Sequence, residues 1–560
     1  MKRNLMKFLI KAVFALFLAV CVLPANAQDQ GVFSGNFEAN YNVFIRDSLI
    51  GATNTPQYDE QLTGGEAWLN LNYSIKGLNL GLRFDMFNNS NLLNPTGSYT
   101  GQGIGRWFIN KKINKFNVEV GYIYDQIGSG IIYRAWESRP LLIDNALLGG
   151  KISYDINDNW TIKAFSGKQK FLFGQNPGII KGASVEGFLA LGNEESPISL
   201  SPGIGFVNRT LEEETMDLII DNVESYLPDE QIKPVYNVYL FSAYNTLSYK
   251  SLTWYLEGAY KSEEAFFDST EPRTETTGVI TFGKFKKEAG SVLYTSLSFA
   301  KGKLGITIEG KRTNNFNFRS DPNLTLNRGL INYIPPMNRF NTYRLTARYA
   351  PATQDLSEQA FQADIRYRLN KKVSFLANFS NITDLSDDKN LLYREILGEV
   401  AYKYKRAWQL TGGLQLQKYN QQVYEVKPNV PLVSTVTPYL DFLYKFSRKK
   451  SIRIETQYMA TDQDFGSWFF ALAEYGIAPH WIFEASIMYN ISPSDKSPKD
   501  PDTGESLNIV YPTLGVVYVN KANRFQLRYV KQVEGIVCSG GICRLEPAFS
   551  GVKFSVTSNF

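Results

Sequence analysis

Hydrophobic and polar residues alternate along most of the chain with a period of two. In one stretch Leu82, Phe84 and Met86 are apolar, and Arg83 and Asp85 stand between them. Successive side chains of a β-strand point to opposite faces, so this alternation predicts strands with one apolar and one polar face. Runs of about ten such residues end at tight turns rich in lysine and asparagine, and longer connections separate the resulting pairs. The pattern predicts a series of β-hairpins.

The alternation favours a membrane barrel over a soluble β-sandwich. A sandwich also alternates apolar and polar positions. It does not usually do so over this many strands with 33 tyrosines and 37 phenylalanines gathered near strand ends, where a transmembrane barrel has its aromatic girdles. The final strand, residues 551–560, places Val552, Phe554 and Val556 on one face. Its last residue, Phe560, resembles the C-terminal membrane-insertion signal of bacterial outer-membrane barrels.

We therefore predict an all-β fold, a transmembrane antiparallel β-barrel of about 24 strands, within a range of roughly 22 to 26 because strand boundaries slip by a few residues. Barrels of this class have short periplasmic turns and long extracellular loops. The expected periplasmic turns are residues 76–79, 157–159, 301–303, 370–372, 447–450 and 520–523. The expected extracellular loops are residues 47–63, 88–100, 126–145, 210–234, 263–276, 317–341, 421–433 and 492–506. Residues 28–560 are expected to form a single barrel domain.

Residues 1–27 have the features of a cleaved signal peptide. Lys2 and Arg3 open a basic segment, an apolar run follows, and the stretch ends on Ala-Asn-Ala, a small-x-small cleavage pattern. A lipoprotein with its lipid on Cys21 is the alternative, but Val20 is larger than the residue usually found before such a cysteine. We expect export to the cell outer membrane.

The charge balance excludes one class of partner. Of 59 lysines and arginines, four lie in the leader, so 55 remain against 54 aspartates and glutamates. No global positive charge indicates a nucleic-acid partner. The predicted lumen face mixes both signs, with Arg344 and Arg348 on one expected strand and Asp364 and Arg366 on the next. Both an open pore and a lumen filled by ion pairs are compatible with this mixture.

The expected loop of residues 126–145 is too apolar to lie free in water. Its apolar side chains are Ile131, Ile132, Trp136, Leu141 and Leu142. We predict that it folds into the lumen and narrows it. A constriction that selects solutes is one hypothesis for its charged residues, which are Arg134, Glu137, Arg139 and Asp144. The alternative is that these charges only pair with the barrel wall.

Two cysteines, Cys538 and Cys543, remain once the leader is removed. An even pair in an exported protein predicts a disulfide. A redox role is less favoured because the spacing is not Cys-x-x-Cys and no basic residue lies between the thiols. The predicted topology places the pair in the last extracellular loop. Closing so short a loop would stabilise the fold at the low end of the usual range.

The chain offers little for catalysis or metal binding. Its single histidine, His480, is expected at a periplasmic turn, poorly placed to act as the base that acyl-transfer enzymes set beside their nucleophile. Two cysteines cannot complete a structural zinc site. We therefore expect no enzyme, no cofactor and no metal centre.

The segment of residues 210–232 is strongly acidic and predicts a short amphipathic helix in an extracellular loop. Thr210 followed by Glu213 is a candidate capping box. Apolar residues recur at helical spacing, at Leu218, Ile219 and Val223. The ordered ligand spacing of an EF-hand calcium loop is absent, so we interpret the acidic face as solvated.

Two motifs carry a family resemblance. The first is Gly128-Ser129-Gly130 followed by Ile143-Asp144-Asn145-Ala146, and the second is Cys538-Ser539-Gly540-Gly541-Ile542-Cys543-Arg544 followed by Pro547-Ala548-Phe549-Ser550-Gly551. In these motifs the chain resembles an uncharacterised family of large outer-membrane β-barrel proteins of Bacteroidota. The resemblance spans the chain after its leader. It implies a fold and a location, but no activity and no functional residue.

These observations predict an outer-membrane barrel that acts as a channel or as a component of an export complex, with an unknown substrate. The alternative is a closed barrel that displays its extracellular loops for binding, adhesion or complex scaffolding. Expected partners are outer-membrane lipids and the barrel-assembly machinery, with outer-membrane lipoproteins or periplasmic proteins as further candidates. The two functions differ in whether residues 126–145 and their neighbours leave a continuous aqueous path.

Overall fold

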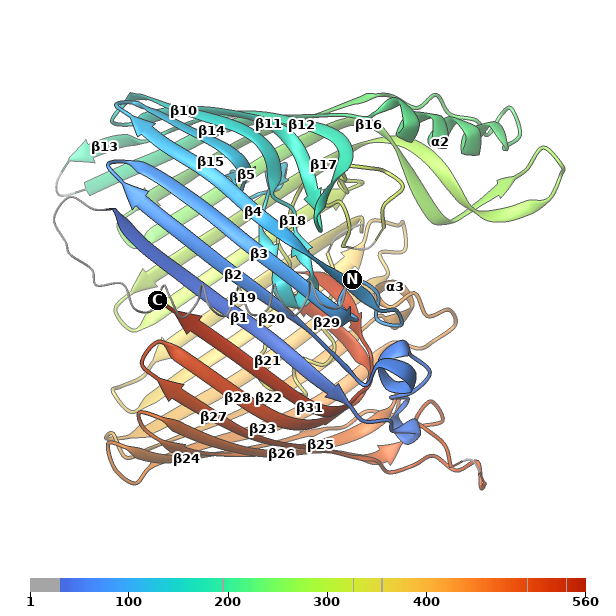
Figure 1. Ribbon diagram of the computed structural model, residues 1–560. Helices are drawn as coiled ribbons and strands as arrows, with labels where there is room; N and C mark the ends of the chain where they lie inside the picture. The colour runs from blue at the N-terminus through green and yellow to red at the C-terminus, as the bar shows by residue number, and fades with distance from the viewer. Residues whose placement is uncertain (1–30, 194–195, 326, 354–355, 501, 540) are drawn as a thin grey trace, which may run out of the picture.

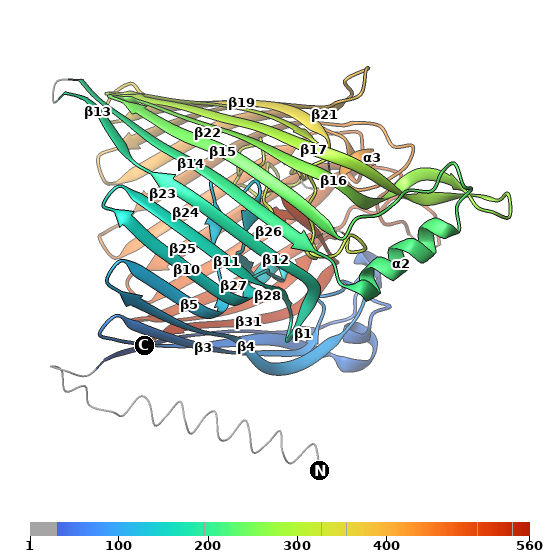
Figure 2. The ribbon, with the colours of Figure 1, turned by 90° about the horizontal axis from the view of Figure 1, so that it is seen from above.

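A computed structural model describes residues 31–560 except 194–195, 326, 354–355, 501 and 540. The expected signal peptide and Cys21 lie outside the described residues. Among the described residues, 24 antiparallel strands form one closed wall, as predicted. Strand β1 (Val32–Phe44) pairs with the last strand, β31 (Phe549–Asn559), so the sheet closes on itself (Figures 1 and 2).

The wall strands follow one another around the barrel in chain order. The first eight are β1, β2 (Thr63–Ile75), β3 (Leu78–Ser90), β4 (Tyr99–Ile113), β5 (Phe116–Ile123), β10 (Leu147–Asn157), β11 (Trp160–Phe171) and β12 (Gly174–Gly187). The next eight are β14 (Ser196–Thr210), β15 (Asn237–Tyr249), β16 (Leu252–Thr274), β17 (Ile280–Lys301), β18 (Leu304–Asn314), β19 (Glu358–Arg368), β20 (Val373–Asp384) and β21 (Leu391–Tyr404). The last eight are β22 (Trp408–Tyr419), β23 (Val433–Lys445), β24 (Lys450–Met459), β25 (Gly466–Ile477), β26 (Trp481–Pro493), β27 (Val510–Asn520), β28 (Asn523–Gln532) and β31. The short strand β13 (Leu189–Asn193) follows β12 and pairs with β14.

The wall buries its charged face and exposes its apolar face, which is the reverse of the arrangement in a soluble protein. On β3, the inward residues Arg83 and Asp85 are 2% and 4% exposed, whereas the outward residues Phe84 and Met86 are each 42% exposed. Burying charges while exposing apolar side chains is unfavourable in water. It suits a barrel whose outer face lies in lipid. The observed fold is therefore that of an outer-membrane β-barrel.

The two ends of the barrel differ in the length of their connections. At one end, here called the turn end, tight turns join the strands, and all six predicted periplasmic turns lie there. The chain also finishes at the turn end, where the backbone N of Gly35 donates to the carbonyl oxygen of Phe560 at 2.7 Å. The opposite end, here called the loop end, carries the long connections. Among them is the segment between β1 and β2, which contains η1 (Ser48–Ile50) and η2 (Gln57–Gln61).

One predicted extracellular loop, residues 263–276, was wrong, because most of it is strand. β16 and β17 continue past their neighbours, since β15 pairs with β16 only as far as Lys261 and β18 pairs with β17 only from Ser291. The two strands form a hairpin that projects beyond the barrel rim at the loop end (Figure 2). The register shifts twice within it. These shifts interrupt the period of two, which is why the sequence pattern indicates a loop.

The predicted amphipathic helix is α2 (Glu213–Glu224), which lies beside the projecting hairpin (Figure 1). The predicted capping box was wrong. Thr210 ends β14 and donates from its hydroxyl to Oδ1 of Asn237 at 2.7 Å, and Glu212 is the N-cap. Leu218 is exposed rather than packed. The apolar cluster that joins the helix to the hairpin consists of Leu211, Met216, Ile219, Val223, Tyr226, Ala265 and Phe285.

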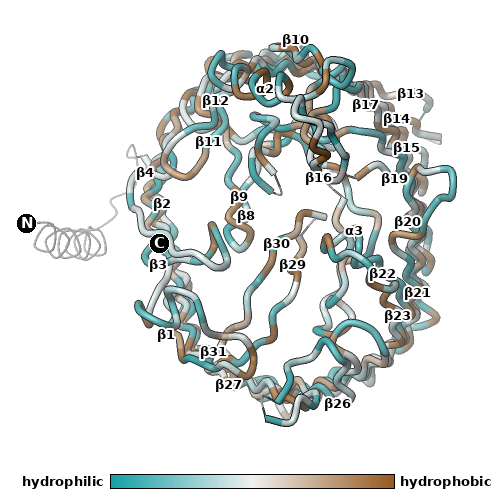
Figure 3. The backbone as a smooth tube through the Cα atoms, turned by 90° about the vertical axis from the view of Figure 1, so that its right-hand side faces the viewer, coloured by the Kyte–Doolittle hydropathy of each residue, from teal (hydrophilic) through white to brown (hydrophobic). Residues whose placement is uncertain are grey.

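Three loops from the loop end fold back into the lumen (Figure 3), and together we call them the plug. Loop A, residues 124–146, contains β6 (Gln126–Ile127), β7 (Tyr133–Arg134), β8 (Glu137–Ser138), η3 (Arg139–Leu141) and β9 (Ile143–Asp144). Loop B, residues 315–357, joins β18 to β19 and is longer than the predicted loop 317–341. Loop C, residues 533–548, carries a hairpin of β29 (Gly535–Ser539) and β30 (Ile542–Glu546).

The plug has its own apolar contacts. Leu141 and Ile143 of loop A, Leu330 of loop B and Ile542 of loop C form one buried cluster. In loop A, Ile131 and Ile132 are also fully buried. A short helix, α3 (Gln421–Tyr424), follows β22 at the loop end. Within the described part of the chain, none of the helices is long and apolar enough to cross a membrane.

Candidate functional site

The plug is fastened to the wall by buried charges, most densely where loop A meets β3. Asp144 of loop A pairs with Arg83 of β3, and the distance between Oδ2 and Nη2 is 2.6 Å. Lys170 of β11 pairs with the same carboxylate. The hydroxyl of Tyr124 donates to Oδ1 of Asp144 at 2.5 Å. One carboxylate therefore connects loop A to two strands of the wall.

Arg83 is the centre of this cluster. Its Nε lies 2.6 Å from Oδ1 of Asp85 on the same strand, and its Nη1 lies 2.9 Å from Oε1 of Glu137 in loop A. Removing a guanidinium from water is costly unless its donors are engaged by acceptors in the protein. Three carboxylates supply those acceptors, so the arginine is tolerated inside the barrel and holds loop A in place.

Arg139 extends the cluster to two further strands. Its guanidinium pairs with Glu38 of β1 and, at 3.0 Å, with Glu137. It also lies 5.1 Å from the ring centroid of Trp68 in β2, a favourable position for a cation over an indole ring. Loop A thus contacts β1, β2, β3 and β11 through charged groups.

Arg134 lies apart from the other three predicted constriction residues. Its guanidinium stacks on Tyr333 of loop B, 4.2 Å from the ring centroid, and lies 5.4 Å from the centroid of Trp136. The structure therefore brings Glu137, Arg139 and Asp144 together against the wall and places Arg134 between loops A and B. A role for the four residues in selecting solutes stays a prediction.

Loop A crosses the lumen to a distant part of the wall. Ser129 donates from its backbone N and its Oγ to Oε2 of Glu257 in β16, at 3.0 and 2.5 Å. Beside this contact, Gly205 of β14 faces Ile127. A Cβ on Gly205 would lie 2.3 Å from Cγ2 of Ile127. The wall therefore needs a glycine here to let the loop approach.

Loop B is held by amide side chains of the wall. Gln417 of β22 donates from Nε2 to the carbonyl oxygen of Tyr349 at 2.8 Å. Oε1 of Gln457 in β24 accepts a hydrogen bond from the backbone N of Leu345 at 2.7 Å. A buried loop must satisfy its backbone polar groups without a neighbouring strand. Inward glutamines perform that role here.

The expectation that Arg344 and Arg348 lie on a wall strand was wrong, because both belong to loop B, whose backbone bonds to wall side chains. Nη2 of Arg348 lies 3.5 Å from Oδ2 of Asp464, in the connection between β24 and β25, and Lys427 lies 3.6 Å from the same carboxylate. Burial by itself raises the pKa of Asp464. Arg348, Gln421 and Lys427 outweigh burial and hold this pKa below its ordinary value.

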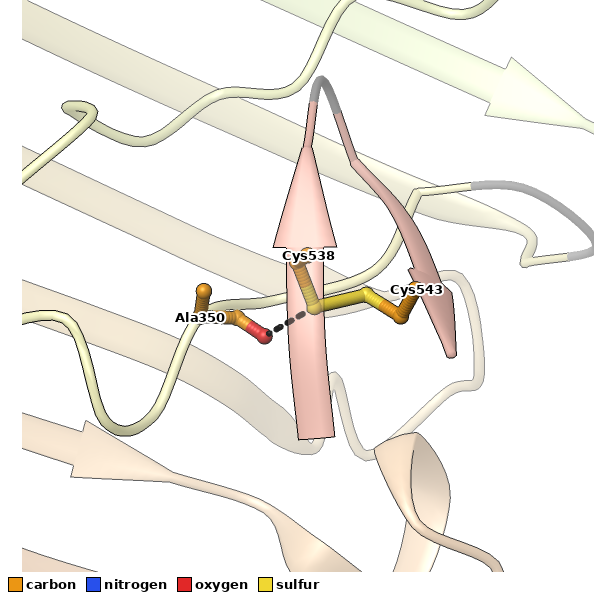
Figure 4. The surroundings of a disulfide bond; sticks show 3 residues. All are labelled: Ala350, Cys538 and Cys543. Carbon is orange, nitrogen blue, oxygen red and sulfur yellow. Dashed lines mark hydrogen bonds between the residues drawn. A yellow bond between two sulfur atoms is a disulfide. The ribbon is translucent and has the colours of Figure 1, made fainter. Parts of the chain in front are cut away.

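Loop C carries the predicted disulfide, which is confirmed. Cys538 of β29 and Cys543 of β30 are bonded across the hairpin (Figure 4). The hairpin does not stay outside, as an extracellular loop would, but turns into the lumen (Figure 3). There Sγ of Cys538 lies 3.4 Å from the carbonyl oxygen of Ala350, and the backbone N of Thr353 donates to the carbonyl oxygen of Gly541 at 3.0 Å. Loops B and C are thereby joined.

The inward face of the wall changes from buried to water-exposed along the barrel axis. On β19, from the loop end to the turn end, the exposed fraction of the side chain is 0% at Glu358, 21% at Asp364 and 69% at Arg366. On β24 it is 5% at Glu455 and 31% at Arg453, which lies nearer the turn end. The plug therefore fills the loop-end part of the lumen. The turn-end part forms a vestibule lined by charged side chains.

Other chemistry is sparse in the described part of the chain. No group of His, Cys, Asp and Glu among those residues could hold a metal ion. His480 lies at the turn end, where its Nδ1 is 2.8 Å from the carbonyl oxygen of Val519. This contact connects the turn between β25 and β26 to the end of β27.

Several residues that anchor the plug were not predicted from the sequence to belong to a site. Among them are Arg83, Lys170 and Glu257. Each stands on the polar face of its strand, like many residues of the vestibule. The period of two places a charge in the lumen, but it does not say which loop will meet it. The one usable signal was the apolar composition of residues 126–145, which indicated that something in the lumen must cover them.

A family model described as "Family of unknown function (DUF6029)" matches residues 5–560. The chain belongs to this family. Its origin in Bacteroidota stays a prediction. No match was found among curated proteins.

The fold is similar to several solved structures of outer-membrane proteins. One is the P pilus usher (PapC) translocation pore, with 9% identity, 94% of this chain and 99% of that chain covered, and a TM-score of 0.42. A mutant of the ferric enterobactin receptor (PfeA) from Pseudomonas aeruginosa has 8% identity, 96% and 81% coverage, and a TM-score of 0.41. The siderophore receptor PirA from Acinetobacter baumannii has 7% identity, 96% and 81% coverage, and a TM-score of 0.39. Likenesses this remote carry no argument about function.

Proposed function

We propose that the chain is a gated conduit of the outer membrane, a channel or a component of an export complex, held closed by the plug. The observation that carries this proposal is the division of the lumen. Its turn-end part is polar and water-exposed, as at Arg366, and its loop-end part is occupied by loops that fold in from the rim. A conduit needs a hydrated polar path and an element that can leave it.

The wall closes without help from the plug. β1 pairs directly with β31, and each wall strand is hydrogen-bonded to its neighbours. Loops A, B and C are connected to the wall by ion pairs, hydrogen bonds and side-chain packing. Movement of the plug would therefore break loop contacts and leave the barrel intact.

The plug leaves little space for a small-molecule ligand where it is anchored most densely. The cavity beside Arg83, also lined by Trp68, Leu141 and Leu330, measures about 80 Å³. Ligand pockets are usually about 300–1,000 Å³. This favours a closing role for loop A over a binding pocket at that position.

The proposal includes a route to the membrane and a set of partners. Residues 1–27 direct export, and Phe560 at the turn end serves as the signal for the barrel-assembly machinery. The outward apolar face contacts outer-membrane lipids. Lipoproteins or periplasmic proteins would reach the conduit from the vestibule side. No catalytic step is part of the proposal, since the only histidine is engaged at a turn.

Single-channel recording in a planar bilayer tests the proposal with three forms of the protein. They are the intact chain, a variant lacking residues 127–144 of loop A, and a control lacking the equally long segment 213–230, which includes α2 outside the lumen. We expect the intact chain and the control to stay mostly closed, and the loop A deletion to conduct steadily. Folding of each form is checked by its heat-dependent mobility on a denaturing gel.

A closed barrel that displays its loops is the second candidate. The observation in its favour is the projecting hairpin of β16 and β17, which α2 supports through an apolar cluster. A hairpin of this kind presents exposed apolar residues beyond the rim, such as Phe282, which is 73% exposed. If all three folded forms fail to conduct, and a folded form that also lacks the lumen segments of loops B and C fails as well, the conduit is refuted and display is the better account.

A further inference from the structure

Lysines and arginines concentrate on four consecutive turns at the turn end of the barrel. The turn between β17 and β18 carries Lys301 and Lys303, and the turn between β19 and β20 carries Arg368, Lys371 and Lys372. The next two turns carry Lys403, Lys405 and Arg406, then Lys445, Arg448, Lys449 and Lys450. We call this set the basic arc. Because two strands separate adjacent turns, their tips lie about 10 Å apart.

The basic arc has no counter-charge of its own. Residues 299–305, 366–373, 402–408 and 444–452 contain no aspartate or glutamate. Within the described part of the chain, no carboxylate forms an ion pair with Lys371, Lys372, Lys405 or Arg406, and all four are exposed. The spacing of the turns is close to the Debye length at about 0.1 M salt, so their positive potentials reinforce one another. An anionic group beside the arc would relieve this repulsion.

Exposed apolar side chains within the same turns indicate that the basic arc lies beside lipid. Leu369 is 44% exposed and Phe446 is 58% exposed, although both lie in turns rather than in the middle of strands. Tyr404 is 38% exposed on the outward face, and Nζ of Lys405 lies 5.5 Å from its ring centroid. Aromatic rings with lysines beside them are typical of the depth at which lipid headgroups begin.

The turns are too short to lift the cations out of the headgroup layer. Lys405 and Arg406 follow Tyr404 directly. A strand rises about 3.3 Å per residue and is tilted by roughly 35–45° in such barrels, so these cations lie within about 5 Å of the aromatic ring along the membrane normal. A protein partner in the aqueous space would meet them less readily than the phosphates of the leaflet itself.

The geometry points to the basic arc as a binding site for anionic phospholipids, whose phosphate groups it gathers in the leaflet at the turn end. The site is independent of whether the lumen conducts. It would favour lipids with a net negative headgroup over zwitterionic ones, because each lysine near an anionic surface strengthens binding by about fivefold.

The test compares two variants of the full-length protein with equal loss of charge. The arc variant carries Lys371→Gln, Lys372→Gln, Lys405→Gln and Lys449→Gln. The control variant changes four exposed lysines of the loop end, with Lys233→Gln, Lys389→Gln, Lys496→Gln and Lys499→Gln. Each protein is purified from mixed micelles with equal amounts of phosphatidylglycerol and phosphatidylcholine, and the retained lipids are counted by native mass spectrometry.

We expect the unmodified protein and the control variant to retain phosphatidylglycerol preferentially, and the arc variant to lose this preference by at least about tenfold. Equal preference in the arc and control variants would overturn the proposal and leave the arc to an acidic protein partner.

Inorganic phosphate, added at constant ionic strength, separates the two sources of phosphate. If phosphate displaces the lipid where chloride at the same ionic strength does not, the arc prefers free phosphate to the headgroup, and the leaflet lipid is not its ligand. If the lipid stays, the headgroup in its leaflet is the ligand.

Discussion

Replacing Asp144 by asparagine should release loop A from the wall without unfolding the barrel. The side chain of Asp144 is 15% exposed and faces two cations, Arg83 and Lys170, whose side chains are 2% and 3% exposed. Asp144→Asn removes the negative charge and keeps the size of the side chain. Arg83 retains Asp85 and Glu137, whereas Lys170 retains, among the described residues, only the carboxylate of Asp85, at 3.8 Å, and so loses the most.

The size of the effect follows from these contacts. Removing one partner of a buried ion pair costs about 3–5 kcal/mol. Asparagine can still accept a hydrogen bond and the site is slightly exposed, which favours the lower end, about 3 kcal/mol. At 1.4 kcal/mol for each factor of ten, the open state of loop A should gain roughly a hundredfold in population.

Hydrogen exchange measured by mass spectrometry reports this local opening. In Asp144→Asn we expect amides of residues 126–145 to exchange roughly a hundredfold faster, while amides of β1 and β31 are unchanged. The control is Glu484→Gln, which breaks the pair between Glu484 of β26 and Arg528 of β28, two wall strands. Equal exchange of loop A in both variants, or early loss of the barrel strands in Asp144→Asn, would refute the reasoning.

Two further predictions concern single contacts of loops A and B. Gly205→Ala should loosen loop A, because the new Cβ would meet Ile127. Gly258→Ala serves as the control, since a Cβ there would meet open space. Hydrogen exchange of the amides of residues 126–134 measures the difference, and equal exchange in the two variants would contradict the prediction. The pKa of Asp464 is lower in the folded protein than its ordinary value of about 3.9. The contact of Asp464 with Arg348 should therefore be fully formed above about pH 3.9 and should be lost as the pH falls through the folded-state pKa. Proteolysis of loop B should therefore accelerate below about pH 4, and an Asp464→Asn variant that kept the same pH dependence would rule this out.

The wall could be predicted from the sequence because its physical rule is local. A strand between lipid and water must alternate, and Phe84, Arg83 and Asp85 follow that requirement residue by residue. The number of strands and the tight turns follow from the same rule. The disulfide was also predictable, since Cys538 and Cys543 were the only pair left after the leader.

The plug could be predicted only in small part, because its contacts are not local. Arg83 and Asp144 lie on separate elements, and nothing in their spacing indicates that they meet. Arg344 and Arg348 alternate with other residues as a strand would, yet their loop bonds to wall glutamines. The projecting hairpin was missed for another reason, since its register shifts break the period of two.

The central claim is that the lumen is an open vestibule at the turn end and closed by the plug at the loop end. Cysteine labelling of the intact protein tests it most directly, with Arg366→Cys and Gln362→Cys, two inward positions of the same strand. The side chain of Arg366 is 69% exposed, and Gln362 is 7% exposed. We predict fast reaction of a hydrophilic maleimide at position 366 and little at position 362 until loops A and B are removed. Equal rates at the two positions in the intact barrel would contradict the account.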